Sequence, residues 1–119
     1  MIKDIKITPL KILSDNRGKV MHMLRNDSPV FKKFGEIYFS SIYHQAIKGW
    51  HLHKESYLNY CCVVGEVKLV LFDDRPDSET KNTFQEIILS PNKYFLVTIP
   101  PNIWNGFKGI GTETSIIAN

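Results

Sequence analysis

Two runs of β-branched, aromatic and aliphatic residues flank a single glycine in the stretch 57–72, YLNYCCVVGEVKLVLF. Such residues are enriched in strands, and a glycine between two strands favours a tight turn. The pattern therefore predicts that 57–64 and 66–72 are strands joined at Gly65 as a hairpin.

Short runs of the same character recur along the chain, and no segment longer than about ten residues keeps a helical period. Turn-forming residues separate the runs, most clearly at 14–18 and 73–78. The predicted strands are 5–13, 19–24, 36–43, 50–53, 57–64, 66–72, 83–89, 93–99, 103–107 and 114–118. Short strands at this spacing predict an all-β sandwich or barrel.

The length and net charge of the chain limit the classes of protein to which it can belong. Its 119 residues allow one core, so 1–119 is expected to be a single domain. Fifteen basic and twelve acidic residues leave a net charge of +3, too little to indicate a nucleic-acid partner. No stretch reads as a membrane helix or a signal peptide. The adjacent Cys61 and Cys62 are expected to be free thiols packed in a strand, which favours a cytoplasmic location.

Two histidines, His51 and His53, stand two residues apart in the run 50–53. Side chains alternate along a strand, so both imidazoles are expected on one face. Such a pair suits metal ligation or general acid–base catalysis, although two rings that only fill the interior are also possible. A metal needs further ligands, but Glu55 follows too closely and no later histidine exists. Acid–base catalysis without a metal is therefore favoured.

Six motifs follow one another in order along the chain. They are RG at 17–18, KGWH at 48–51, VGEV at 64–67, DDRPDSET at 73–80, LSPN at 89–92 and IPPNIWNGF at 99–107. In order and spacing this set resembles the dTDP-4-dehydrorhamnose 3,5-epimerase family. The resemblance implies a cupin-type double-stranded β-helix (jelly roll), that is, a single cupin-like β-barrel domain. It also implies a homodimer that exchanges N-terminal strands.

The resemblance further implies a sugar epimerase that acts on a nucleotide-linked 4-keto-6-deoxyhexose, with no metal or cofactor, in bacterial surface-polysaccharide (O-antigen) biosynthesis. By match to the family motif, His51 is the general base that forms an enolate beside the ketone. Lys48 stands where the family has an arginine and is expected near the enolate oxygen. Arg17 matches a family arginine that meets the pyrophosphate; a surface turn arginine is the alternative.

The chain departs from the family pattern at the proton donor. The family's catalytic tyrosine falls near Ala118 in this sequence. His53 and Tyr38 are the favoured replacements, with Tyr43, Tyr60 or water as alternatives. Because fewer groups remain, inversion at C3 alone is favoured over inversion at both C3 and C5.

A second departure lies in the motif at 99–107, where Asn105 replaces a family histidine and follows Trp104. We expect Asn105 to bond sugar hydroxyls and Trp104 to stack on a ring. An amide that bonds loop carbonyls and a tryptophan that fills the core are the structural alternatives. Phe34, Phe39 and Tyr94 are expected in the core.

Three other functions stay open at this point. A 3,4-ketoisomerase would use the same enolate chemistry, a metal-dependent cupin would use the histidine pair, and a degenerate relative would only bind the sugar nucleotide. The nucleotide itself, dTDP, CDP, GDP or UDP, leaves no fixed motif.

Overall fold

The computed structural model describes all 119 residues and contains eleven strands and no helix. The strands are β1 (Lys6–Pro9), β2 (Ile12–Asp15), β3 (Gly18–Met21), β4 (Phe39–Ile42), β5 (Ile47–His51), β6 (Leu58–Val64), β7 (Val67–Asp73), β8 (Thr83–Leu89), β9 (Phe95–Ile99), β10 (Ile103–Gly109) and β11 (Ser115–Ala118). Apart from the first, each predicted run overlaps one strand. The chain has no helix of the length and apolarity needed to cross a membrane.

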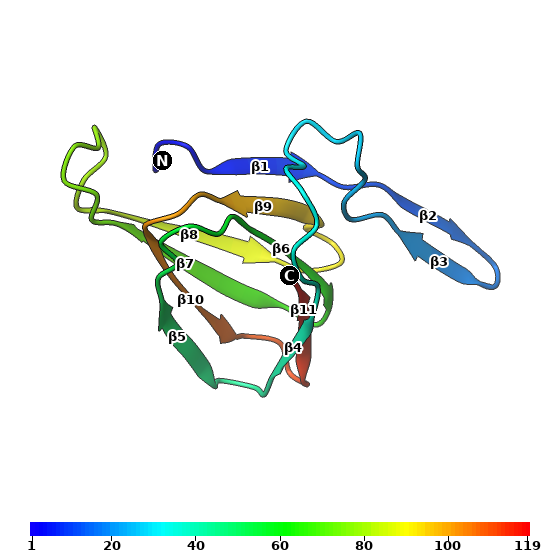
Figure 1. Ribbon diagram of the computed structural model, residues 1–119. Helices are drawn as coiled ribbons and strands as arrows, with labels where there is room; N and C mark the ends of the chain where they lie inside the picture. Colours follow the sequence, from blue (N-terminus) through cyan, green and yellow to red (C-terminus); the bar gives the residue numbers. More distant parts are fainter.

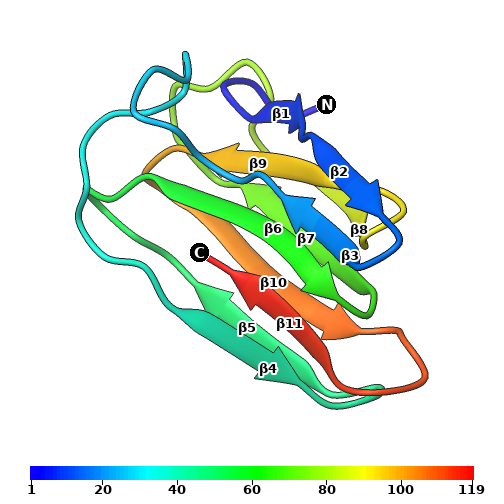
Figure 2. The ribbon, with the colours of Figure 1, turned by 90° about the vertical axis from the view of Figure 1, so that its right-hand side faces the viewer.

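Two antiparallel sheets form the two layers of the molecule (Figures 1 and 2). One has the order β1-β9-β6-β11-β4 and the other the order β5-β10-β7-β8. A separate hairpin, β2–β3, projects from the body. This double-sheet arrangement is a jelly roll, so the predicted all-β fold is confirmed.

Alternation along the strands builds the core between the sheets. In β7, Val67, Leu69 and Leu71 are fully buried, while the intervening residues are half-buried on the outer face. They pack in one cluster with residues of the opposite sheet such as Tyr60 and Val97. Each fully buried aliphatic side chain stabilises the fold by about 1.5–3 kcal/mol.

A second apolar cluster lies on the outer face of the five-stranded sheet. Cys61, Tyr94, Leu96 and Ala118 form its buried centre, and the side chains of the segment 10–30 cover it. Cys62 points the other way, into the core between the sheets. Both cysteines are free and buried, as predicted.

The two strands predicted around Gly65 are present as β6 and β7, but the predicted hairpin is wrong. β6 pairs with β9 and β11, whereas β7 pairs with β8 and β10 in the other sheet, so the turn at Gly65 connects the two sheets. This tight turn requires glycine at position 65. Its φ of 79° lies in the left-handed region. A Cβ at this position would also lie only 2.8 Å from the Cα of Ser115. The Ser115 hydroxyl donates to the carbonyl of Glu66 and accepts from its N–H, which ties this turn to β11.

The predicted run 5–13 is divided into two strands that belong to different sheets. β1 pairs with β9 as far as Pro9, and the Leu10 N–H still donates to the carbonyl of Tyr94. The chain then leaves the sheet, and β2 pairs with β3 instead. Apolar composition is the same on both sides of this break, so it gives no signal of the change in partner.

Two of the three residues expected in the core are exposed, and the prediction for them is wrong. Phe39 is 68% exposed because it alternates with Ser40 and Ile42, and Ile42 takes the inward position. Phe34, 74% exposed, lies outside any strand. Tyr94 is buried, as predicted.

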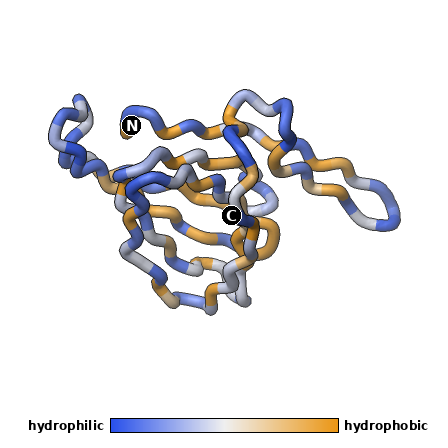
Figure 3. Tube along the Cα trace, viewed as in Figure 1, coloured by the Kyte–Doolittle hydropathy of each residue, from blue (hydrophilic) through white to orange (hydrophobic).

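The loop between β7 and β8 ties the N-terminal segment to the body. Asp73 is fully buried and accepts hydrogen bonds from Arg75, Ser78 and Thr80. Arg75 also donates to the carboxylate of Asp4 at 3.0 Å. The exposed part of this loop and the tip of the β2–β3 hairpin are hydrophilic (Figure 3).

Candidate functional site

A bulge in edge strand β5 brings two predicted site residues to one face. His51 pairs with Asn105 of β10 and Lys48 pairs with Phe107, so β5 has one residue more between these pairs than β10. Asn105 and Phe107 both face the interior. Directly opposed residues share a face, so His51 and Lys48 lie on the interior side of the sheet.

The bulge depends on close contact between the two backbones. A Cβ at Gly106 would lie 3.1 Å from the carbonyl oxygen of Lys48, and one at Gly49 would lie 3.2 Å from the Cα of Gly106. Larger side chains at either glycine would push the strands apart at the place where His51 leaves the sheet. His51 itself is exposed, at the end of β5.

Asn105 of β10 is the residue directly opposite His51, and its side chain is completely buried. Its Nδ2 donates to the His51 carbonyl at 3.2 Å, and its Oδ1 accepts from the Tyr60 hydroxyl at 3.1 Å. Tyr60 comes from β6, in the opposite sheet. Burial, with a smaller effect from the charge of Tyr38, raises the pKa of Tyr60, which keeps its hydroxyl protonated.

Lys48 joins the open edges of the two sheets. Its Nζ donates to the Ser40 hydroxyl at 3.0 Å and to the Ser41 carbonyl at 2.6 Å, both in β4. A lysine ammonium has three donors, so one stays available to a ligand. The exposed ammonium lies on the same side of β5 as His51.

Tyr38 and His53 both line a cavity of about 750 Å³. It is lined by Met23, Leu24, 31–38, His53, 55–59 and Asn119. The Tyr38 hydroxyl accepts from Nδ2 of Asn119 at 2.9 Å, and Oδ1 of Asn119 accepts from the N–H of Asn59. Asn59 and Asn119 are not predicted as site residues from the sequence, because a polar residue near the end of a strand gives no specific indication of a site.

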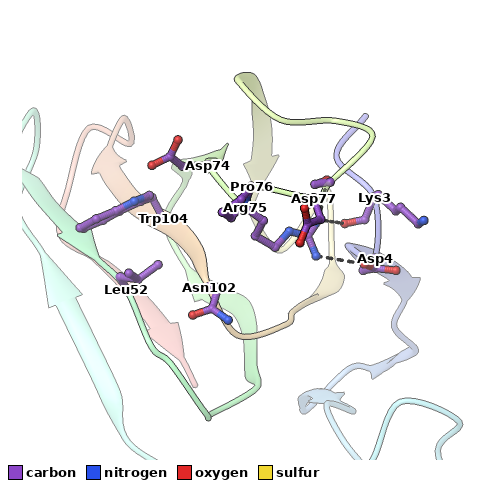
Figure 4. Close-up of a pocket in the computed structure, with 10 residues that line it drawn as sticks. Lys3, Asp4, Leu52, Asp74, Arg75, Pro76, Asp77, Asn102 and Trp104 are labelled. Carbon is purple, nitrogen blue, oxygen red and sulfur yellow. Dashed lines mark hydrogen bonds and ion pairs between the residues drawn. The ribbon is translucent and has the colours of Figure 1, made fainter.

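Trp104 lies on the other side of its sheet from Asn105. It lines a polar cavity of about 500 Å³ with Leu52 and the loop around Arg75 (Figure 4). The Arg75 guanidinium pairs with the carboxylates of Asp73 and Asp4, so its contacts are within the protein. Within one chain, the structure does not bring Trp104 to the cavity of Tyr38 and His53.

Arg17 is also distant from these residues, in the turn of the projecting β2–β3 hairpin (Figure 1). Its side chain is 86% exposed and pairs with Asp15 at 2.7 Å. The structure therefore groups His51, Lys48 and Asn105, places Tyr38 and His53 in the lining of one cavity, and leaves Trp104 and Arg17 apart. No three His, Cys, Asp or Glu side chains gather in a way that could hold a metal ion.

Comparison with known proteins identifies the family. The family model for dTDP-4-dehydrorhamnose 3,5-epimerase matches residues 1–118. The chain belongs to the dTDP-4-dehydrorhamnose 3,5-epimerase family. The sequence-based prediction of this family is thereby confirmed, together with the jelly-roll fold and the assignment as an epimerase enzyme.

Relatives of this epimerase come from archaea and bacteria. It is 29% identical to a probable low-salt glycan biosynthesis epimerase, Agl13, of Haloferax volcanii, over 99% of this chain and 77% of the relative. It is 30% identical to the spore coat polysaccharide biosynthesis protein SpsL of Bacillus subtilis, over 98% of this chain and 78% of the relative. The crystal structure of a dTDP sugar isomerase from Desulfovibrio desulfuricans superimposes with a TM-score of 0.96 at 35% identity, covering 99% of this chain and 76% of that one.

Proposed function

We propose that this epimerase inverts C3 of a nucleotide-linked 4-keto-6-deoxyhexose, with His51 as general base, in the biosynthesis of a surface polysaccharide. The observation that carries the proposal is the arrangement at the end of β5. His51 is exposed, occupies the position of the base in the family motif, and shares a face with Lys48. The names of two relatives, a glycan and a spore coat polysaccharide protein, support the biosynthetic context.

The chemistry follows from the acidity of a C–H bond next to a ketone. The His51 imidazole takes the C3 proton, the electron pair of that bond forms the C3–C4 double bond, and the C4 oxygen becomes an enolate. The Lys48 ammonium stabilises this negative charge. A proton then returns to C3 on the opposite face, and the ketone forms again. Tyr38 and His53, which share one cavity, are the proposed source of that proton.

For the nucleotide we propose dTDP, in line with the family description and with the dTDP sugar isomerase. Arg17 is proposed to meet the pyrophosphate of a substrate bound to a second copy, because it lies far from His51 on a projecting hairpin. A contact of Trp104 with the sugar stays a prediction. The expected contact of Asn105 with the sugar is not proposed further, because its side chain is completely buried and bonded to Tyr60 and to the His51 carbonyl.

We further propose a homodimer that uses the β2–β3 hairpin. Leu13 and Val20 are opposed in that hairpin and both are exposed, so this apolar pair has no cover within its own chain. Sedimentation equilibrium is expected to give the mass of two chains. A cytoplasmic location, proposed from the free thiols Cys61 and Cys62, agrees with a nucleotide-sugar substrate.

The test is proton NMR in D2O with dTDP-4-keto-6-deoxyglucose as substrate and with the CDP-linked sugar in parallel. We expect deuterium at C3 alone, and no exchange with His51→Asn. His22→Asn is the matched control and should exchange at the wild-type rate. Exchange at both C3 and C5 would indicate that the enzyme inverts both carbons instead of C3 alone. Binding without any exchange would instead indicate a sugar-nucleotide binding module.

A further inference from the structure

A chain of hydrogen bonds crosses the interior from one sheet to the backbone of the proposed base. The Tyr60 hydroxyl donates to Oδ1 of Asn105, and Nδ2 of Asn105 donates to the carbonyl of His51. Tyr60 and Asn105 are both buried, and no buried side-chain nitrogen or oxygen of the molecule lacks a partner. This series of hydrogen bonds therefore extends from buried residues in the core to the exposed end of β5.

Only one assignment of donors and acceptors is consistent with these hydrogen bonds. The His51 carbonyl accepts but cannot donate, so the amide nitrogen of Asn105 must face it. The amide oxygen then faces Tyr60, which must act as the donor. Burial keeps the Tyr60 hydroxyl protonated, since it raises its pKa, so this direction holds throughout the neutral range.

The His51 carbonyl needs this support because β5 is an edge strand. β5 pairs only with β10, and the bulge interrupts that pairing between Lys48 and His51. The Asn105 amide reaches the backbone of the proposed base at this interrupted point. Without it, the end of β5 would lose a contact that fixes the direction of the imidazole.

We infer that Tyr60, acting through Asn105, is a positioning residue for proton abstraction by His51. Tyr60 is 4% exposed, so it does not meet the substrate itself. The inference rests on the proposed function, because it assumes that His51 is the base. It assigns Asn105 the role of holding the backbone of the proposed base.

The first test is Tyr60→Phe, which removes the hydroxyl and keeps the ring that packs edge-on against Phe107. A buried amide oxygen is then left without a donor, so the amide is free to turn away from the His51 carbonyl. We expect kcat and the rate of C3 exchange in D2O to fall by about tenfold, the effect of one lost buried hydrogen bond, with KM unchanged.

Tyr94→Phe is the matched control. Tyr94 is as buried as Tyr60, but its hydroxyl lies in the outer cluster, 3.8 Å from Sγ of Cys61. Both variants lose one buried hydroxyl, so thermal melting should show similar small losses of stability. Only Tyr60→Phe should lower kcat, and Tyr94→Phe should stay within twofold of the wild type.

A double mutant tests whether Tyr60 acts through Asn105. Asn105→Leu keeps the branched shape of the side chain and removes both its donor and its acceptor. If the inference holds, Tyr60→Phe causes no further loss of kcat in the Asn105→Leu background, because the connection is already broken.

The outcomes separate this inference from the proposed function. If the wild type exchanges C3 and Tyr60→Phe keeps the wild-type kcat, or loses no more than Tyr94→Phe, the inference is overturned and the proposed function stands. A further tenfold loss in the double mutant would also overturn it. If the wild type does not exchange C3, the proposed function fails and the inference fails with it.

Discussion

Replacing Asp73 by Asn tests the loop that ties the N-terminal segment to the jelly roll. The buried carboxylate accepts three hydrogen bonds from Arg75, through its N–H, Nε and Nη2, and one each from the hydroxyls of Ser78 and Thr80. An amide of the same shape has one oxygen and no negative charge. It leaves several of these donors without a partner beside the Arg75 guanidinium.

The size of the effect follows from burial. Breaking a buried ion pair by removal of one charge costs about 3–5 kcal/mol. Arg75 keeps the carboxylate of Asp4 at 3.0 Å and the carbonyl of Lys3 at 2.9 Å, which favours the lower end of that range. For a domain of this size, a loss of about 3 kcal/mol lowers Tm by about 10–15 °C.

The same carboxylate makes stability depend on pH. The hydrogen bonds from Arg75, helped by Ser78 and Thr80 and opposed by burial, hold the pKa of Asp73 well below its usual range. The unfolded chain therefore takes up this proton at higher pH than the folded chain. The stability from Asp73 is complete above a pH of about 5 and is lost as the pH falls below about 4.

Thermal melts of wild type and Asp73→Asn between pH 7 and pH 3 provide the assay. The difference in Tm should be largest at pH 7 and should shrink below pH 4. Asp15→Asn is the control, because its pair with Arg17 is exposed and such pairs contribute little. A variant that melts within 3 °C of the wild type at pH 7, or two curves parallel down to pH 3, would refute the reasoning.

Three further predictions concern Lys48 at the edge of the site, the turn at Gly65 and the buried thiols. Lys48→Met should lower kcat by about 10²-fold or more, since it removes the donor beside the enolate; unchanged C3 exchange would argue against that role. Gly65→Ala should cost about 2–4 kcal/mol in urea unfolding, because of its positive φ and the collision with Ser115, whereas Gly35→Ala has open space and should cost little. Burial raises the pKa of Cys62 to about 11, so Ellman's reagent should react with it only after unfolding; rapid reaction of the folded protein would contradict its burial.

The strands could be predicted from the sequence because their apolar residues alternate or cluster between turn formers. Thr83–Leu89 has the bounds that its pattern indicates. The change of partner after Pro9 could not be predicted, since β1 and β2 have similar composition and differ only in the strand that pairs with them. Phe39 shows the same limit, because an aromatic residue in a strand does not reveal which face the core occupies.

At the site, strand alternation alone predicts the wrong arrangement of Lys48 and His51. Lys48 and His51 are three positions apart, which in a regular strand places them on opposite faces. The bulge adds one residue between them and restores a common face. Conversely, Trp104 and Asn105 are adjacent in a regular strand, so their separation on two faces follows from the sequence once β10 is recognised.

The bulge also explains how an amide can stand where the family has a histidine. β5 has one neighbour in its sheet, so the end that carries His51 depends on what β10 and the turn before it provide. The N–H of Asn102 donates to the His53 carbonyl at 2.7 Å, and the Asn105 side chain donates to the His51 carbonyl at 3.2 Å. The second contact acts on the backbone of the proposed base, the first acts on the backbone two residues further along, and neither needs an imidazole. A group at position 105 that donates to this carbonyl is therefore enough to hold the end of β5, and the chemistry of the proton donor is left to side chains elsewhere.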